Sequence, residues 1–146
     1  MKNKIEKYIP QAIEAVKKEL LIASKSENQN DKNGKKTKVI KSEYNSYISS
    51  LASGLVQSGL LPTLAFYTNL NSKSIEPRRL LLQAIYKTLH QEKLEDKLTG
   101  DELLKEAISK NEKPLESFQL KEDIKNAAVA IKLAIRTFPL EKRTEN

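Results

Sequence analysis

The side chains best suited to chemistry in this chain are its basic ones, because its acidic residues and its one histidine form no catalytic pattern. The chain holds 26 Lys and Arg, 19 Asp and Glu, and a single histidine, His90. Adjacent acids such as Glu95 and Asp96 point to different sides of a helix, which predicts solvated charges rather than acid and base catalysis. The four glycines are too scattered for a phosphate-binding loop. We therefore expect no catalytic residues and no enzyme activity.

Excess positive charge is concentrated near the start of the chain. Residues 1–41 hold 11 Lys and 5 acidic residues, whereas residues 42–75 balance at zero and residues 76–113 hold eight of each sign. Lysine side chains neutralise phosphates and release their condensed counterions, so the cluster between Lys35 and Lys41 predicts binding to a polyanion. A solvated linker is the alternative interpretation of this cluster.

Further basic candidates lie on predicted helices. Arg78 and Arg79 open a helix, where the macrodipole disfavours cations, so an external anion would relieve their placement. Lys132 and Arg136 lie four residues apart and share a face of the last helix. For each of these residues a solvated helical face is the alternative. The full set of candidate phosphate-binding residues is Lys17, Lys18, Lys35, Lys36, Lys38, Lys41, Arg78, Arg79, Lys132 and Arg136.

Hydrophobic periodicity predicts an all-α fold, a compact bundle of about five to six helices in one domain that spans residues 1–146. The helices are expected over residues 9–23, 39–58, 61–71, 76–97, 102–110 and 117–138, and no segment has a strand pattern. Residues 24–36 contain no apolar side chain and predict a flexible linker. Residues 139–146 predict a disordered tail. The last helix is expected to bury Phe118, Ile124, Ala128, Ile131 and Ile135.

Two local signals mark helix ends. Gly59 is a natural left-handed stop, and Pro62 fits the first turn of a following helix, so the chain should fold back there as a helical hairpin. Gly54 within the first of these helices suggests close contact between helices. Thr99 and Glu102 have the spacing of a capping box, in which each side chain satisfies the other residue's backbone amide.

The hairpin lies in a stretch with an unusual composition. Between Tyr44 and Ser72 the chain has no Asp, Glu, Lys or Arg, although charged residues make up 31% of the sequence. The side chains on the expected outer face are Ser, Thr, Asn and Gln, so this stretch predicts either a protein-binding surface or simply part of the core. The candidate protein-contact residues are Tyr44, Tyr47, Phe66 and Tyr67.

The same stretch resembles a known family. Tyr44, Tyr47 and Leu51, followed by Gly59-Leu60-Leu61-Pro62-Thr63-Leu64-Ala65-Phe66, are similar to the tyrosine, hydrophobic helix and hairpin of the Cmr small-subunit family. The leading helix and the closing helix, over residues 127–138, follow in the same order. The chain departs from the family pattern at Ser53-Gly54, where Leu-Pro is common, and it lacks a tryptophan in the closing helix. The resemblance covers roughly residues 9–138.

The resemblance implies a function that composition alone cannot give. That family supplies the small helical subunit of type III-B CRISPR complexes, which act in antiviral defence. It implies a noncatalytic subunit without cofactor or metal that stacks in a short filament beside the backbone subunits and contacts guide RNA and target RNA. It also supports an RNA-facing role for Arg136. The alternative is a helical protein-binding adaptor with no nucleic-acid role, whose lysines serve solubility.

Composition also indicates a compartment. The chain has no cysteine, which excludes a disulfide framework and thiolate metal sites and suits a reducing cytoplasm. Its basic start is followed by Pro10 and Glu14 rather than by an apolar run, which argues against a signal peptide. Polar residues and Pro62 interrupt the uncharged stretch too often for a membrane helix. We therefore expect a cytoplasmic protein with no membrane partner.

Overall fold

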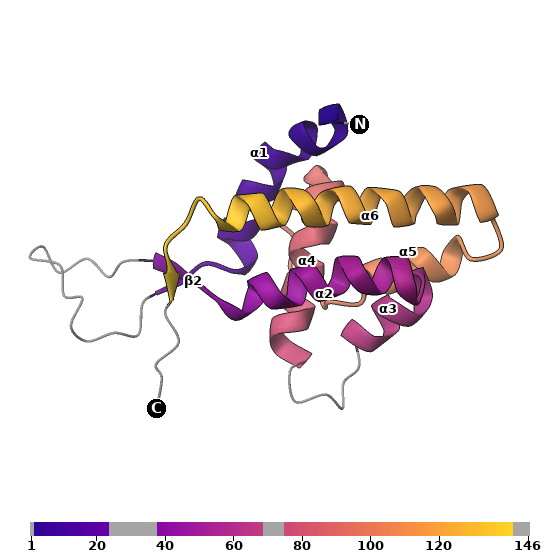
Figure 1. The fold of residues 1–146 in the computed structure, drawn as a ribbon, viewed down its shortest axis with the longest axis horizontal. Helices are drawn as coiled ribbons and strands as arrows, with labels where there is room; N and C mark the ends of the chain where they lie inside the picture. Colours follow the sequence, from indigo (N-terminus) through magenta and orange to yellow (C-terminus); the bar gives the residue numbers. More distant parts are fainter. Residues whose placement is uncertain (1, 24–37, 69–74, 142–146) are drawn as a thin grey trace, which may run out of the picture.

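The computed structural model describes residues 2–23, 38–68 and 75–141 of the chain. Helices dominate this part, which confirms the predicted all-α fold. The main helices are α1 (Lys2–Glu19), α2 (Glu43–Gln57), α3 (Leu60–Tyr67), α4 (Ile75–Leu89), α5 (Glu102–Ser109) and α6 (Pro114–Ile135). A 3-10 turn, η2 (Gln91–Lys93), follows α4. In Figure 1 the long helix α6 runs beside α2, and α4 crosses behind them. None of the described helices is long and apolar enough to cross a membrane.

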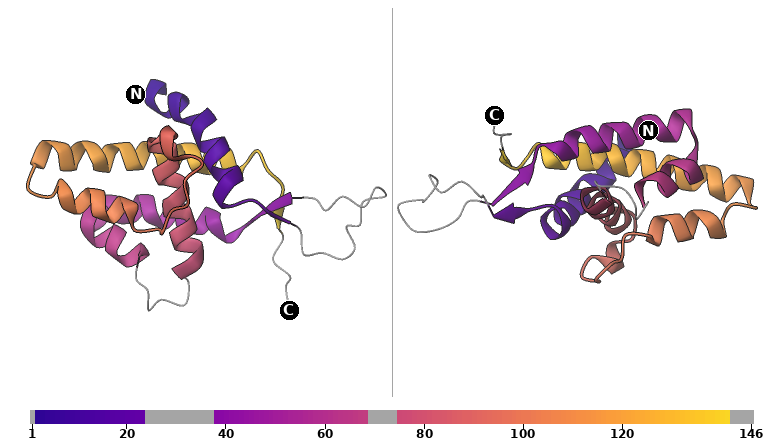
Figure 2. Two further views of the ribbon diagram at one scale, coloured as in Figure 1. Left: turned by 180° about the vertical axis from the view of Figure 1, so that it is seen from behind. Right: turned by 90° about the horizontal axis from the view of Figure 1, so that it is seen from below.

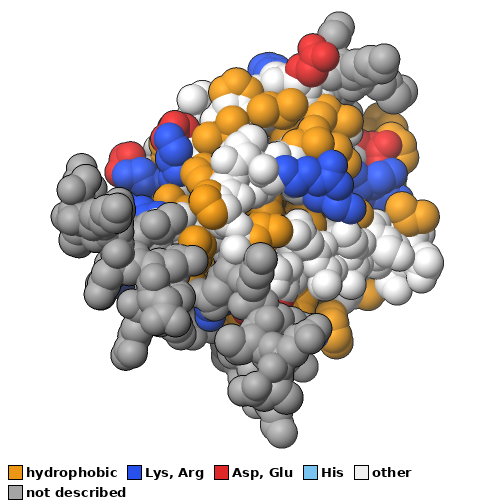
Figure 3. Space-filling view, turned by 60° about the vertical axis from the view of Figure 1, so that its left-hand side comes forward, with side chains coloured by type: hydrophobic (Ala, Val, Ile, Leu, Met, Phe, Trp, Pro, Cys, Tyr) orange, Lys and Arg blue, Asp and Glu red, His pale blue; other side chains and the backbone are white. Residues whose placement is uncertain are grey.

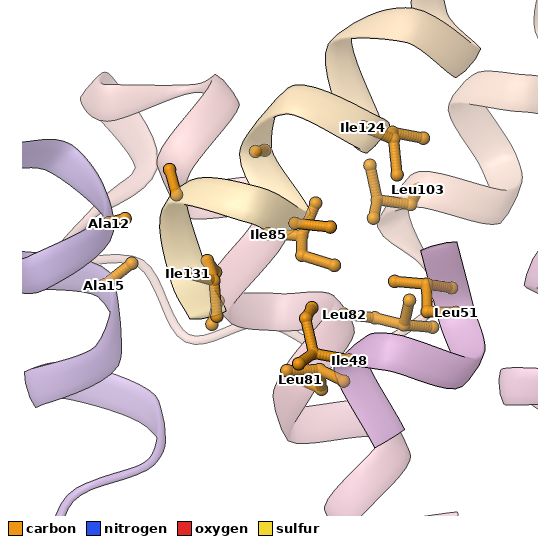
Figure 4. Packing of buried hydrophobic residues seen from close by; sticks show 14 of the residues in the cluster. Ala12, Ala15, Ile48, Leu51, Leu81, Leu82, Ile85, Leu103, Ile124 and Ile131 are labelled. Atoms are coloured by element: carbon orange, nitrogen blue, oxygen red, sulfur yellow. The ribbon is translucent and has the colours of Figure 1, made fainter. Parts of the chain in front are cut away.

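The core lies where α1, α4 and α6 meet. Small side chains of α1, Ala12 and Ala15, are fully buried against α6, whose own alanines let the helices approach closely. Ile85 of α4 and Ile131 of α6 fill the space beside them (Figure 4). Complete burial of one such aliphatic side chain contributes roughly 1.5–3 kcal/mol. These three helices therefore form the centre of the bundle, and the hairpin packs against α4 and α6.

Three short strands correct the prediction that no strand occurs. Strand β2 (Lys38–Lys41) pairs antiparallel with β1 (Ile22–Ala23) and parallel with β3 (Leu140–Glu141). They form a small sheet at the end of the bundle opposite the connection from α5 to α6 (Figures 1 and 2). The strands are too short for a periodic pattern, and their pairing depends on contacts between distant parts of the chain. Residues 39–41 were predicted to begin the second helix and instead belong to strand β2. Residues 140–141 were predicted to be disordered and instead form strand β3.

Several helix boundaries differ from the predicted ones. Helix α1 begins at Lys2 and carries Pro10 in its interior, where Pro10 is exposed. Helix α4 ends at Leu89 because His90 has non-helical backbone angles, φ −122° and ψ 82°. The charged residues beyond it offer no apolar stripe to extend the helix. The predicted linker 24–36 and residues 142–146 of the predicted tail lie outside the described residues.

Helix α6 is buried over only part of its length. Ile124, Ala128, Ile131 and Ile135 are buried as predicted, whereas Phe118 is 58% exposed. The helix begins at Pro114, so its first turns extend past the apolar side chains of its neighbours. The prediction that Phe118 lies in the core is therefore wrong, although its spacing matches the buried stripe.

The predicted hairpin is confirmed. Gly59 connects α2 to α3 with a φ of +98°, in the region that favours glycine, and Pro62 lies in the first turn of α3. A Cβ at Gly54 would lie 3.1 Å from Oγ1 of Thr63, which shows how closely the two helices approach. Leu51, Leu55 and Leu64 are fully buried between the hairpin and the rest of the bundle. Val56, at the end of α2, is 66% exposed.

Candidate nucleic-acid and protein interface

The outward face of α2 is covered by hydroxyl and amide groups. Its exposed polar side chains are Ser46, Ser49, Ser50, Ser53 and Gln57. Because no residue from Tyr44 to the end of α3 is charged, this hydroxyl face has no carboxylate of its own to repel an anion. Figure 3 shows one side of the molecule, on which Lys and Arg side chains gather beside a wide white area with few acidic side chains.

Helix α6 brings two of the predicted basic residues to the edge of this hydroxyl face. Nζ of Lys132 donates a hydrogen bond to Oγ of Ser49, 3.1 Å away. Arg136 lies one turn further along α6 and is exposed. Among the described residues no carboxylate lies within ion-pair distance of either cation. The hydroxyl partner positions the ammonium group of Lys132 without cancelling its charge.

A groove of about 530 Å³ runs between the hairpin and the start of α4. Its floor and walls come from α2, α3 and Arg78 of α4, which together we call the hairpin groove. The lining residues are Ser46, Tyr47, Ser50, Gly54, Ser58, Pro62, Thr63, Phe66, Tyr67 and Arg78. Four of these, Tyr47, Phe66, Tyr67 and Arg78, were singled out from the sequence, but the sequence did not indicate that they meet.

Arg78 enters the hairpin groove among three aromatic rings. Its guanidinium carbon lies 4.5 Å from the ring centre of Phe66 and 5.7 Å from those of Tyr47 and Tyr67. Attraction between a guanidinium and a ring face stabilises this placement and keeps the positive charge. The macrodipole argument from the sequence expected an external anion to stabilise Arg78, whereas ring faces of the hairpin already do so.

Hydrogen bonding and burial fix Tyr67 beneath Arg78. Its hydroxyl donates to the backbone carbonyl of Tyr47, 2.7 Å away, which ties α3 to α2. Burial raises the pKa of Tyr67 to about 12, although the nearby positive charge of Arg78 acts in the opposite direction. Tyr67 therefore stays neutral at physiological pH and serves as a fixed wall of the groove.

The four predicted protein-contact residues differ in their access to solvent. Tyr44 is 3% exposed and Tyr67 is 4% exposed, so neither can make a broad contact with a partner. Phe66 is 55% exposed and Tyr47 is half-buried. Tyr44 supports the hairpin from inside the core, since its neighbours one turn away, such as Ile48, are buried with it.

The other basic candidates lie elsewhere. Lys17 and Lys18 of α1 pair with carboxylates, at 3.5 Å from Glu14 and 2.9 Å from Glu95 respectively. Lys38 and Lys41 lie in strand β2, the first exposed and the second half-buried. Lys35 and Lys36 lie outside the described residues.

Arg79 has a structural partner instead of an external anion. Its guanidinium donates a hydrogen bond to the backbone carbonyl of Thr99. Gly100 has a φ of +100°, and a Cβ there would lie 2.7 Å from Nε of Arg79. Arg79 thus holds the connection that leads from α4 into α5.

The capping box that follows this connection is half confirmed. The Glu102 carboxylate accepts from the backbone amide groups of Thr99, at 2.7 Å, and Gly100, at 2.9 Å. The Thr99 hydroxyl does not return the bond to an amide but donates to the carboxylates of Asp101 and Glu102. Burial alone would raise the pKa of Glu102, but the amide hydrogen bonds outweigh it and lower that pKa.

The single histidine makes contacts that suit a structural link. His90 Nε2 lies 2.9 Å from Oε1 of Glu106, and its ring packs 4.6 Å from the ring of Tyr86. These contacts join the end of α4 to α5. Within the described ranges no group of three His, Asp or Glu side chains is placed to hold a metal ion.

Comparison with known protein families identifies a match. A family model described as CRISPR-associated protein (Cas_Cmr5) matches residues 26–119, which is more than half of the chain. The matched segment includes the hairpin, α4 and α5, and therefore the whole hairpin groove. Lys132 and Arg136 lie beyond it. No curated protein and no solved structure matches the chain.

Proposed function

The chain belongs to the CRISPR-associated Cas_Cmr5 family, the small subunits of type III-B complexes, and we propose on this premise that it is a noncatalytic subunit that contacts RNA phosphates. In this proposal other subunits perform cleavage. Copies of the chain stack in a short filament beside the backbone subunits and border the channel that holds guide and target RNA. The family match supports membership of the complex, and the surface of the chain supports the division between RNA contact and protein contact.

The observation that carries RNA contact is the placement of Lys132 beside the hydroxyl face. Its hydrogen bond to Ser49 leaves a full positive charge at a surface with no carboxylate of α2 beyond Tyr44. Arg136 adds a second exposed cation one turn away. Such a surface favours phosphates without reading bases, because it offers charge and hydroxyl groups but no exposed aromatic ring on α6 near these cations. Lys17, Lys18, Lys38 and Lys41 remain in the proposed set as weaker contributors.

A salt titration tests RNA contact. With about five phosphates neutralised, single-stranded RNA binding should weaken roughly a hundredfold between 50 and 200 mM salt. Replacing Lys132 and Arg136 together by Gln should reduce the slope of log affinity against log salt by about 1.4, or ~0.7 for each phosphate lost. Binding is measured by fluorescence anisotropy, with the full chain assembled with its partner subunits.

The matched control is Lys105→Gln. Lys105 is exposed on α5 and pairs with Asp101 at 3.4 Å, so its loss should leave the salt slope unchanged. If the chain is an adaptor that binds only protein, complexes assembled with wild type, with the double variant and with Lys105→Gln would all show the same salt slope. Equal slopes in wild type and in the double variant would exclude Lys132 and Arg136 from the contact.

A further inference from the structure

The aromatic ring of Phe118 is left outside the core. It lies near the start of α6 and is 58% exposed. Nζ of Lys121 lies 5.8 Å from the ring centre, within reach of a cation–π contact. This contact brings a positive charge to the ring, while more than half of Phe118 remains exposed. Phe118 is thus available to a ligand that can stack on an aromatic ring.

The ring of Phe118 is in line with four cations on α6. At 3.6 residues per turn, Phe118 and Arg136 are about five full turns apart, so they lie on the same face of the helix. Three lysines between them fall within about 60° of this line. The four basic residues, which we call the cation row, are Lys121, Lys125, Lys132 and Arg136. With a rise of about 1.5 Å per residue, the ring and the cation row together extend roughly 27 Å along α6, which is long enough for several consecutive nucleotides.

The surface beside the cation row is largely neutral. The hydrogen bond from Lys132 to Ser49 places the row next to α2, and the two helices run side by side in opposite directions (Figure 1). From Ser49 the row therefore continues towards the end of α2 and the turn at Gly59, a stretch without charged residues. On α6 itself, Glu122 pairs with Lys125 at 3.1 Å, and both side chains are 36% exposed. Exposed pairs of this kind are weak, so a phosphate can replace the carboxylate.

An exposed ring in line with cations is the combination that binds single-stranded nucleic acids. Such proteins follow the backbone with a positively charged surface and stack bases on aromatic side chains. A protein partner at Phe118 is the alternative. It is less consistent with the cation row, because Lys is depleted at the centres of protein interfaces.

We infer that Phe118 stacks on an unpaired base of single-stranded RNA whose phosphates follow the cation row towards Arg136. The inference rests on the proposed RNA contact and extends it, because it adds Lys121 and Lys125 to the phosphate contacts and assigns a contact to a base. Every base has a face that can stack, so this contact does not select a sequence.

Affinity and salt dependence together separate stacking from charge. RNA binding to the assembled complex is measured by fluorescence anisotropy, as in the salt titration. Phe118→Ala should weaken binding of single-stranded RNA about tenfold and leave the salt slope unchanged, because it removes a stacking contact and no phosphate contact. Replacing Lys121 and Lys125 together by Gln should instead reduce the slope by about 1.4.

Two further replacements of Phe118 distinguish stacking from apolar packing. Phe118→Trp should keep the affinity of wild type, whereas Phe118→Leu, which is apolar but has no aromatic face, should lose as much affinity as Phe118→Ala. Wild-type affinity in Phe118→Ala, or equal affinities in the Trp and Leu variants, overturns the stacking contact. Circular dichroism spectra establish that the variants are folded.

Phe66→Ala is the matched control. Phe66 is similarly exposed, at 55%, but lies on α3 outside the cation row, so its loss should leave RNA affinity unchanged. An equal loss of affinity in Phe66→Ala and Phe118→Ala contradicts a contact specific to Phe118. Gel filtration of the complexes tests the protein alternative, and failure of folded Phe118→Ala to remain with the other subunits assigns the ring to protein and overturns the inference.

Photo-crosslinking locates the base directly. Single-stranded RNA that carries 4-thiouridine is irradiated in the intact complex, and mass spectrometry identifies the modified residues. An adduct at Phe118 is expected, and it should disappear when the RNA is paired with a complementary strand. Adducts confined to other residues, together with a normal loss of slope in the Lys132 and Arg136 double variant, overturn only this inference. An unchanged slope in that double variant overturns the proposed phosphate contact itself.

Discussion

Cations in two regions of this molecule have different partners. Where α1, α4 and α5 pack together, lysines meet carboxylates, as in the pairs of Lys87 with Glu19 and Lys110 with Glu106. Around the hairpin of α2 and α3, Arg78 from the start of α4 meets aromatic rings and Lys132 from the end of α6 meets a hydroxyl. A carboxylate partner cancels charge and links helices, whereas a ring or hydroxyl positions a cation and preserves its charge. The hydroxyl of Ser49 thus leaves the charge of Lys132 for an external partner.

The largest loss of stability is expected from breaking the most buried of the described ion pairs. The side chains of Lys87 and Glu19 are 5% and 11% exposed and join α4 to α1. Lys87→Ala leaves the carboxylate of Glu19 buried without its partner, which should lower the free energy of unfolding by about 3–5 kcal/mol. Urea denaturation followed by circular dichroism measures this loss.

Two further variants show whether the loss arises from burial. Lys105→Ala removes an exposed pair on α5 and should cost less than about 0.5 kcal/mol. The double replacement Lys87→Met with Glu19→Leu removes both charges and should recover most of the stability lost in Lys87→Ala. Similar losses for Lys87→Ala and Lys105→Ala would contradict the distinction between buried and exposed pairs.

Gly59 and Gly100 have similar positive φ angles but different surroundings, so substitutions at the two positions can be compared directly. Gly59 in the hairpin has a φ of +98° and would place a Cβ in nearly open space, with the nearest atom 3.9 Å away. Gly100 has a φ of +100°, but its Cβ would overlap Arg79. Gly59→Ala should therefore cost only the backbone strain, of order 1–3 kcal/mol, and Gly100→Ala should cost more. Thermal and urea unfolding of the two variants measure the difference.

Gly100→Ala is expected to lower the stability more than Gly59→Ala does. If Gly59→Ala is the more destabilising variant, Arg79 does not hold the connection between α4 and α5. A third variant, Gly100→Ala with Arg79→Ala, removes the overlap with Nε and Cγ of Arg79 but keeps the contact with its Cβ, and it should be no less stable than expected from the two single losses.

A smaller effect is expected at the base of the hairpin groove. Tyr67→Phe removes the hydrogen bond to the Tyr47 carbonyl and should cost about 1 kcal/mol. Because the pKa of Tyr67 is raised from 10.0 to about 12, its neutral form stabilises the folded state fully below pH 10. That contribution is lost as the pH rises from 10 towards 12. The difference in unfolding free energy between wild type and Tyr67→Phe should therefore shrink over this range.

The pH series has its own internal control. The pKa values of Tyr8 and Tyr86 are also raised by burial, so wild type and Tyr67→Phe share the changes that these residues cause. A difference that stays constant between pH 10 and 12 would show that the pKa of Tyr67 is the same in the folded and unfolded states. Neighbouring Arg78 would then stabilise the phenolate as much as burial opposes it.

Local signals in the sequence predicted the parts of the fold that depend on neighbouring residues. The turn at Gly59 follows from the absence of a Cβ, and the hairpin follows from an apolar stripe with no charge beside it. Helix α5 begins where Glu102 can accept from the preceding amide groups. Such features depend on residues within four positions of one another, so spacing alone can predict them.

Spacing failed where a helix extends beyond its neighbours or where distant segments pair. Phe118 repeats at the interval of the buried stripe, but no segment that the structure describes covers it at the start of α6. Strand β2 exists because residues 22–23 and 140–141 lie beside it. Whether a side chain is covered, or a backbone group is paired, depends on the position of another segment and not on the period of its own.

Composition and short-range periodicity were enough to predict a helical chain with a charge-free hairpin, and the motif residues of that hairpin carried the resemblance to a small CRISPR subunit. Which partner each cation meets depends instead on how the helices pack. Packing brings Arg78 to the rings of the hairpin and Lys132 to Ser49, although Arg78 and Phe66 are 12 residues apart in the sequence and Lys132 and Ser49 are 83 apart. The packing of helices that are far apart in the sequence sets these distances, so short-range sequence patterns cannot predict them.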